Sequence, residues 1–166
     1  MRTIVNLNKG WQFYKKADLS AVLADGKGEA VDLPHTWNAV DGQDGGNDYY
    51  RGTCLYARRL EVPEHDRTDK IWLEVNGAAH TAVVMLNGET LAEHKGGYST
   101  FRVDLTPHLK EENLLVISVD NSDNDAVYPQ KADFTFYGGL YRDVNLIVVP
   151  AAHFALGYCG TPGMKV

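Results

Sequence analysis

The residues best suited to chemistry lie between Tyr128 and Val144, where Asp133 stands among aromatic residues shortly before a Gly-Gly pair. Aromatic faces stack on the C–H faces of a sugar ring, and a carboxylate accepts hydrogen bonds from sugar hydroxyls. Asp133 and the following Phe134 are therefore candidate sugar-binding residues. The alternative is an aromatic-rich core strand in which the aspartate caps a turn.

A second stretch of the chain combines the same residue types. Asn47 and Asp48 are followed directly by Tyr49 and Tyr50, so polar side chains and two rings share one loop. Tyrosines scattered singly on a surface are the alternative for Tyr49 and Tyr50. Together with Asp133, this loop predicts carbohydrate binding.

Metal, nucleophilic and two-carboxylate chemistry have less support. The run Asp120–Asp125 lacks the central glycine and closing glutamate of a calcium loop, so Asx turns are favoured. The six histidines form no HxH or HxxxH pair, and for His35 and His80 we expect hydrogen-bonded structural roles. No GxSxG motif occurs. Glu74 alternates with apolar neighbours, which predicts a solvent-facing strand residue and not one of the paired carboxylates of glycoside hydrolysis.

The composition is that of an ordinary globular domain. The chain has 166 residues, of which 44% are hydrophobic and 23% charged, and this length fits one domain. A net charge of −6 without a basic run argues against nucleic acid, and no apolar stretch predicts a membrane span. Two cysteines exclude a disulfide framework, although one bridge between Cys54 and Cys159 stays open, and Cys54 is expected to pack as a small apolar residue. Residues 1–10 lack the apolar core of a signal peptide, so cytoplasmic and periplasmic locations both stay open.

Strands must position these residues. Residues 71–75 and 101–105 alternate between apolar and polar side chains, and 81–86 leads into Asn87-Gly88, a strong hairpin signal. Residues 114–119 and 144–149 are further strands, while Thr106 is expected to cap one helical turn that starts at Pro107. Short strands between Gly, Asn and Asp turns predict an all-β antiparallel sandwich, a jelly roll. The long connections 34–52 and 120–139 are expected to be functional.

A series of short motifs resembles the N-terminal domain of glycoside hydrolase family 2 enzymes. In chain order these motifs are Leu33–Asn38, Tyr50–Gly52 with Tyr56–Arg59, Val75–Gly77, Val84–Gly88, Gly96–Phe101, Val119–Asn121 and Gly138–Val144. The likeness runs from about Leu7 to Val149, and within the family it looks closest to the bacterial β-galactosidases. Each motif alone is modest, and their consistent order makes the set specific.

The resemblance implies a galactose-binding-domain-like jelly roll over residues 1–152, with 153–166 as a linker towards an immunoglobulin-like domain and a catalytic (β/α)₈ barrel. The family's acid/base glutamate lies in an Asn-Glu pair, and no such pair occurs in the 166 residues. No catalytic residue is therefore predicted here, and the chain is expected to be inactive alone. The parent enzyme would hydrolyse terminal β-galactosides with retention. The alternatives are a free-standing carbohydrate-binding module, or a structural domain of a β-glucuronidase or β-mannosidase.

For individual residues, the resemblance implies that Asp133 contacts the galactose ring and, in some members, also ligates a sodium ion. Asn47 matches a second sugar contact, and Asp48, Tyr49 and Phe134 are further candidate contacts of the substrate loops. No cofactor is implied for this domain, whereas sodium or magnesium is implied for the parent enzyme. The implied partners are a galactoside or related carbohydrate and the remaining domains of a homo-oligomeric parent. A neighbouring Arg142–Asp143 ion pair is expected to pin the last strand.

Overall fold

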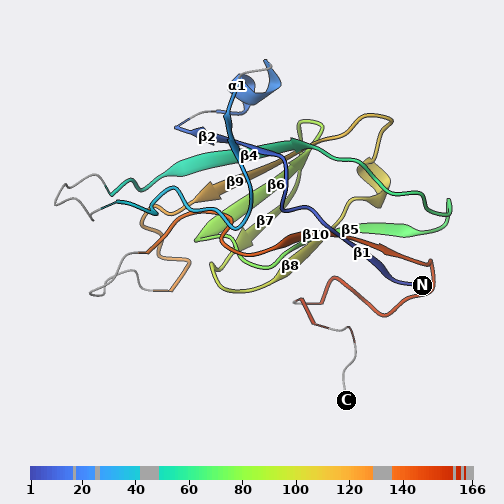
Figure 1. Ribbon diagram of the computed structural model, residues 1–166. Coiled ribbons are helices and arrows are strands. Elements are labelled where there is room, and N and C mark those ends of the chain that lie inside the picture. The colour runs from blue at the N-terminus through green and yellow to red at the C-terminus, as the bar shows by residue number, and fades with distance from the viewer. Residues whose placement is uncertain are drawn as a thin grey trace.

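The computed structural model describes residues 1–16, 18–24, 27–41, 49–128, 136–158, 160–161 and 163. Within these residues, two antiparallel sheets pack face to face (Figure 1). One sheet has the order β1 (Thr3–Asn6), β10 (Val144–Val149), β5 (Lys70–Val75), β8 (Phe101–Asp104). The other has the order β3 (Glu29–Val31), β2 (Trp11–Lys15), β4 (Thr53–Arg59), β9 (Leu114–Asp120), β6 (Thr81–Leu86), β7 (Glu89–Lys95). A short helix α1 (Leu19–Leu23) and a 3₁₀ turn η1 (Thr106–His108) complete the elements. The predicted all-β antiparallel jelly-roll sandwich is confirmed.

Alternation of side chains builds the core between the two sheets. On β5, Ile71, Leu73 and Val75 are fully buried and belong to the main apolar cluster. Each such side chain contributes about 1.5–3 kcal/mol through its removal from water. The turn between β6 and β7 is the predicted Asn87-Gly88 pair, with positive φ angles of 55° and 84°. Cys54 is a free, buried thiol, as expected for a small apolar packing role.

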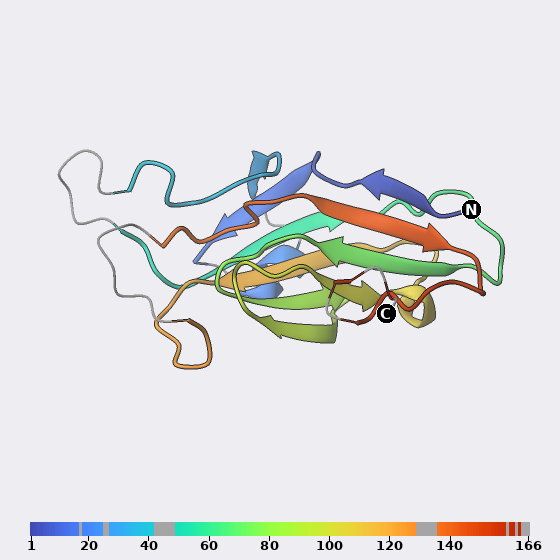
Figure 2. The same cartoon turned by 90° about the horizontal axis from the view of Figure 1, so that it is seen from below.

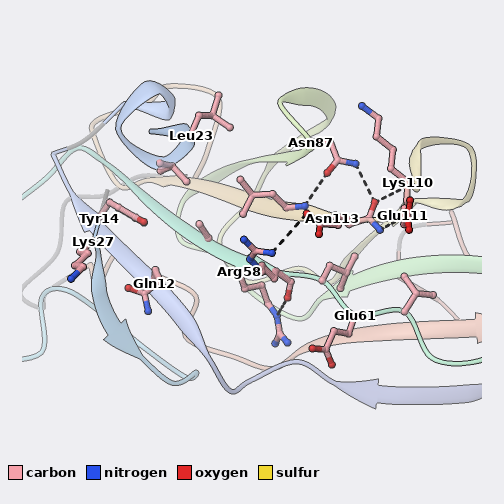
Figure 3. Close-up of a pocket in the computed structure, with 17 residues that line it drawn as sticks. Gln12, Tyr14, Leu23, Lys27, Arg58, Glu61, Asn87, Lys110, Glu111 and Asn113 are labelled. Carbon is pink, nitrogen blue, oxygen red and sulfur yellow. Dashed lines mark hydrogen bonds and ion pairs between the residues drawn. The ribbon is translucent and has the colours of Figure 1, made fainter. Parts of the chain in front are cut away.

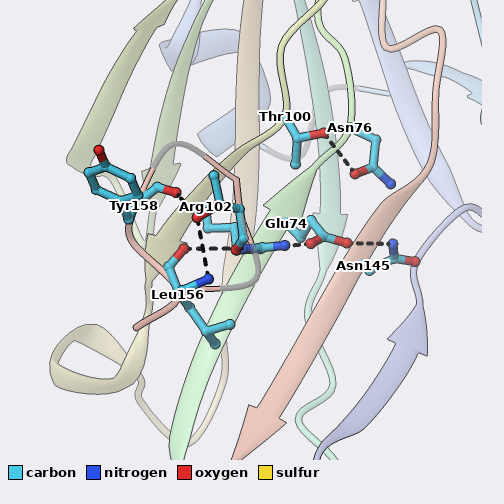
Figure 4. Close-up of polar contacts among 9 residues, drawn as sticks. Glu74, Asn76, Thr100, Arg102, Asn145, Leu156 and Tyr158 are labelled. Carbon is cyan, nitrogen blue, oxygen red and sulfur yellow. Dashed lines mark hydrogen bonds and ion pairs between the residues drawn. The ribbon is translucent and has the colours of Figure 1, made fainter. Parts of the chain in front are cut away.

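Glu74 is not solvent-facing, so that prediction was wrong. Its side chain is buried on the outer face of β5, where the carboxylate accepts from Arg102 Nε at 2.7 Å and from Asn145 Nδ2 at 3.2 Å (Figure 4). The tail covers this pair, because Arg102 also donates to the carbonyls of Leu156 at 3.2 Å and Thr161 at 2.8 Å. A segment about eighty residues away in sequence therefore buries what alternation alone would expose.

The helical turn at η1 begins one residue earlier than expected. Leu105 occupies the capping position, and Thr106 is the first residue of the turn. The Thr106 hydroxyl accepts a hydrogen bond from the backbone N–H of Ile71 at 2.9 Å, so it ties the turn to β5. The prediction of Thr106 as the cap was wrong, because that hydroxyl has a partner on a neighbouring strand.

The described part of the tail lies on the outer face of the four-stranded sheet. Leu156 packs with Ile147 and Val149, and Trp72 borders this small cluster. The assignment of residues 153–166 as a linker to a further domain, and the boundary at residue 152, stay predictions. No helix in the described part of the chain is long and apolar enough to cross a membrane.

Candidate functional site

Two long connections, residues 34–52 and 120–139, meet at one end of the sandwich, which we call the loop end (Figure 2). The described parts of the first are residues 34–41 and 49–52, and those of the second are residues 120–128 and 136–139. These parts flank the segments that carry the predicted sugar contacts, residues 42–48 and 129–135. Those segments lie outside the described residues, so the positions of Asn47, Asp48, Asp133 and Phe134, and a sodium ion at Asp133, stay predictions. The structure therefore describes the residues on either side of these two segments, and not the segments themselves.

A glycine pair lets the two connections touch. A Cβ on Gly138 would overlap the indole ring of Trp37, and one on Gly139 would overlap the carbonyl oxygen of His35. Gly139 also has φ 142°, a conformation that side chains other than glycine rarely adopt. The backbone N–H of His35 then donates to the carbonyl of Leu140 at 2.8 Å. The Gly-Gly pair thus lets the chain that leads into β10 pack directly against residues 35–37.

Two buried amides tie together the described parts of both connections of the loop end. Asn38 is fully buried, and its side-chain oxygen accepts from Asn121 Nδ2 at 3.1 Å and from the N–H of Gly138 at 2.8 Å. Its Nδ2 donates to the Asp41 carboxylate and to the carbonyl of Tyr50 at 2.9 Å. Asn38 therefore uses its full hydrogen-bonding capacity, and we call Asn38 and Asn121 with these partners the amide network.

Residues 120–126 form tight turns and not a metal loop. The Asp120 carboxylate accepts from the backbone N–H of Ser122 at 2.6 Å, and Asn124 accepts from Ala126 N–H at 2.9 Å, so the expected Asx turns are confirmed. Hydrogen bonds from Ser122 and Thr53 to the Asp120 carboxylate hold its pKa below its ordinary value, against the opposing effect of burial. Among the described residues, no group of three or more His, Cys, Asp or Glu side chains could hold a metal ion.

One hydrogen bond joins the flanks of the two undescribed segments. The Tyr49 hydroxyl donates to the carbonyl oxygen of Phe136. Tyr49 directly follows Asp48, and Phe136 stands two residues after Phe134. Burial raises the pKa of Tyr49, so its phenol keeps the proton that this bond needs. The structure describes one of the five predicted site residues, Tyr49. Its hydroxyl forms the hydrogen bond that holds the two connections together.

Rings line the same end of the molecule. His80 is only 1% exposed, and its imidazole meets the rings of Tyr128 and Phe136 edge to face, with centroids 5.5 and 6.0 Å apart. Its Nδ1 has no hydrogen-bond partner among the described residues, so a hydrogen-bonded role for His80 stays a prediction. His35 does have that role, because its Nδ1 lies 2.7 Å from the Tyr56 hydroxyl. Burial lowers the pKa of both histidines, which favours neutral imidazoles.

Arg142 and Asp143 do not pair with each other, so that prediction was wrong. Arg142 Nη1 donates to the carbonyl of Tyr98 at 2.9 Å, and the Asp143 carboxylate accepts from Asn8 Nδ2 at 2.8 Å. Adjacent residues on an extended chain point in opposite directions, so each one anchors a different neighbour. Asn38 and Asn121 were not proposed as site residues, although they belong to two of the quoted motifs.

A large hollow lies elsewhere, on the outer face of the six-stranded sheet (Figure 3). Its volume is about 790 Å³, and several of its polar side chains already serve the fold. Arg58 donates to the carbonyl of Leu7 at 2.6 Å, and Asn87 Nδ2 donates to Asn113 Oδ1 at 3.1 Å. Tyr49, the predicted sugar contact that the structure describes, does not line it. The hollow is lined by Gln12, Tyr14, Val22, Leu23, Lys27, residues 57–62, Asn87 and residues 110–114.

Comparison with known proteins agrees with the motifs. A family model described as "Glycosyl hydrolases family 2, sugar binding domain" matches residues 31–150. A β-glucuronidase of Bacteroides fragilis is 34% identical over 149 residues, covering 89% of this chain and 21% of that protein. A β-galactosidase of Thermoanaerobacter pseudethanolicus is 30% identical over 161 residues, covering 92% and 22%. The crystal structure of an FMN-binding β-glucuronidase from Facaelibacterium prausnitzii superposes with a TM-score of 0.87 at 46% identity, covering 98% of this chain and 25% of that one. The chain thus spans about a fifth of the length of these curated relatives.

Proposed function

The chain belongs to the sugar-binding domains of glycoside hydrolase family 2, and we propose that it serves as the N-terminal domain of a retaining β-glycosidase. In this proposal the domain supplies sugar contacts and no catalytic carboxylate. The relatives named above include both β-glucuronidases and a β-galactosidase. The substrate class is therefore a terminal β-glycoside whose non-reducing sugar touches the loop end.

The hydrogen bond from Tyr49 to Phe136 is the observation that carries this proposal. It fixes two points of the chain together, one of them two residues after Asn47 and the other three residues after Asp133. One residue spans at most about 3.6 Å. The short stretches of chain that lead to the two candidate contacts therefore leave from one anchored point, the bonded pair Tyr49 and Phe136. This supports a single sugar site to which both loops contribute residues, with Asp133 and Asn47 as its polar contacts.

The surroundings suit such a site because they are already organised. The amide network fixes the backbone of both connections that carry the candidate contacts. An Asp133 carboxylate could then accept sugar hydroxyls, each such charge-assisted bond contributing about 1.5–3 kcal/mol. Loops that are fixed before binding lose little entropy when the ligand arrives.

Glucuronides and galactosides remain two candidates for the substrate. The 46% and 34% identities to β-glucuronidases favour a glucuronide, and the 30% identity to a β-galactosidase favours the galactoside expected from the motifs. The enzyme that contains this domain should be assayed with p-nitrophenyl β-D-glucuronide and β-D-galactoside in parallel. The larger kcat/KM identifies the sugar, and activity on neither would contradict the proposal.

Asp133→Ala tests the role of the domain. In the whole enzyme we expect kcat/KM on the preferred glycoside to fall by a factor of about 10–100, the loss of one or two charge-assisted bonds. Asp125→Ala is the matched control, because Asp125 is an exposed carboxylate in the same connection. Equal kcat/KM for wild type and Asp133→Ala would exclude the proposed contact. Calorimetry on the 166-residue chain alone addresses the free-standing module, which requires measurable heat with glucuronate, galactose or lactose.

A further inference from the structure

Three tyrosines form a surface beside the loop end, and we call Tyr98, Tyr128 and Tyr141 the tyrosine surface. The ring of Tyr98 stacks on that of Tyr128, with centroids 4.8 Å apart and planes at 25°. Tyr141 meets Tyr98 edge to face at 6.4 Å. Tyr98 is nevertheless 56% exposed, so one face of this ring stack is open.

Tyr98 is exposed but held in place. Its carbonyl accepts from Arg142 Nη1 at 2.9 Å, and the Tyr141 hydroxyl donates to the carbonyl of the preceding Gly97. A Cβ on Gly97 would stand 2.6 Å from the Tyr128 hydroxyl, so the glycine is what lets the loop lie this close. An exposed ring with a fixed backbone loses little freedom when something stacks on it.

The chemistry of the surface is that of an amphipathic platform. Burial, with a smaller effect of the neighbouring Tyr98 phenol, raises the pKa of Tyr128, so this phenol stays protonated. The Arg142 guanidinium lies 5.3 Å from the centre of the Tyr141 ring and is exposed. Ring faces rimmed by hydroxyls and a cation suit a flat ligand with polar edges, such as a pyranose or an aryl group.

The tyrosine surface adjoins the proposed sugar site. The Tyr128 ring lies 6.4 Å from that of Phe136, whose carbonyl receives the Tyr49 hydroxyl. We propose that Tyr98 stacks against the aglycone ring of the substrate, the second ring of a disaccharide or aryl glycoside. This inference rests on the proposed function, since it needs a glycoside with its terminal sugar at the loop end.

The test compares substrates with and without an aglycone ring. In the whole enzyme, kcat and KM are measured for the p-nitrophenyl and the methyl β-glycoside of the preferred sugar. Tyr98→Ala should raise KM for the aryl glycoside by a factor of about 3–10, which corresponds to one aromatic stacking contact. KM for the methyl glycoside should stay near that of the wild type. Tyr98→Phe, which keeps the ring, should resemble the wild type on both.

Tyr158→Ala is the matched control, because Tyr158 is 60% exposed on the tail. Equal losses on both glycosides for Tyr98→Ala, or a lowered melting temperature, would overturn the inference and indicate a surface covered by another part of the protein. No change on either substrate would also overturn it. If Asp133→Ala has no effect while Tyr98→Ala raises KM for the aryl glycoside alone, the result contradicts the proposed contact between Asp133 and the sugar. It still supports the proposed stacking of Tyr98 on the aglycone.

Discussion

Two buried polar networks hold this domain together, and they differ in the side chain at their centre. The amide network at the loop end is centred on a neutral side chain, Asn38, whose four partners include the Asp41 carboxylate. The network on the outer face of β5 uses a charged pair, Glu74 and Arg102, covered by the tail. The first joins connections that surround a proposed ligand site, and the second clamps a covering segment onto a sheet.

The two networks compensate their buried polar groups for the loss of water in different ways. A buried ion pair needs additional hydrogen bonds to offset the loss of water, and Glu74 and Arg102 receive these from Asn145 and two backbone carbonyls. At the loop end, the Asn38 amide supplies two donors and an acceptor oxygen from one side chain, so it can fix the backbone of two connections at once.

The charged clamp should give the largest loss of stability. Glu74→Ala leaves the Arg102 guanidinium buried without its carboxylate, and the free energy of unfolding should fall by about 3–5 kcal/mol. Chemical denaturation of the 166-residue chain measures this. The double variant Glu74→Leu/Arg102→Leu should recover most of the loss, because no charge is then left unpaired. A single variant as stable as the wild type would show that the tail does not bury the pair in solution.

The amide network should come second. Asn38→Ala removes the acceptor for Asn121 Nδ2 and for the N–H of Gly138, and leaving such buried donors unpaired costs about 2–4 kcal/mol in total. Denaturation is again the measurement, with Asn124→Ala as control, since Asn124 is an exposed turn residue. If the two variants lose the same stability, the network does not hold the loop end.

The pH dependence of stability should be smaller. Burial lowers the pKa of His35, His80 and His94 from the ordinary value of 6.5. The unfolded chain therefore takes up protons first as the pH falls, and stability should decline below about pH 6.5, by about 1.4 kcal/mol for each pKa unit that separates the two states. The lowered pKa of Asp120 acts only below its ordinary value of 3.8.

Denaturation midpoints at several values between pH 7.5 and 4.5 test this decline. His80→Phe should flatten the curve, because the buried imidazole that resists protonation is gone. Constant stability over that range would contradict neutral buried histidines. We expect both polar networks to stay intact over this pH range. The decline in stability should therefore come from His35, His80 and His94.

The smallest effect on stability, with a larger one on function, should come from the bond that joins the two loops. Tyr49→Phe removes one hydrogen bond and should cost about 1 kcal/mol of stability. Because it also uncouples the two loops, kcat/KM on the preferred glycoside should fall further than that cost explains. Tyr50→Phe is the control, since its hydroxyl lies 3.3 Å from the carbonyl of Thr53, within its own connection. Equal kcat/KM for both variants would remove the special role of Tyr49.

Local patterns predicted the strands and the hairpin turn, because alternation and an Asn-Gly pair act within a few residues. They failed for Glu74, whose covering tail lies far along the chain, and for Arg142 and Asp143, where adjacency in sequence was taken for contact. The convergence of Asn38, Asn121 and Gly138 was invisible to local patterns, although each lies in a motif quoted for the family.

A double-mutant cycle with Asn47→Ala and Asp133→Ala tests most directly whether two loops form one sugar site. The measurement is kcat/KM of the whole enzyme on its preferred glycoside, for wild type, both single variants and the double variant. If both side chains hold the same sugar ring, the effects should be non-additive, with a coupling energy of about 0.5–3 kcal/mol. Strictly additive effects, or none in either single variant, would contradict a shared site at the loop end.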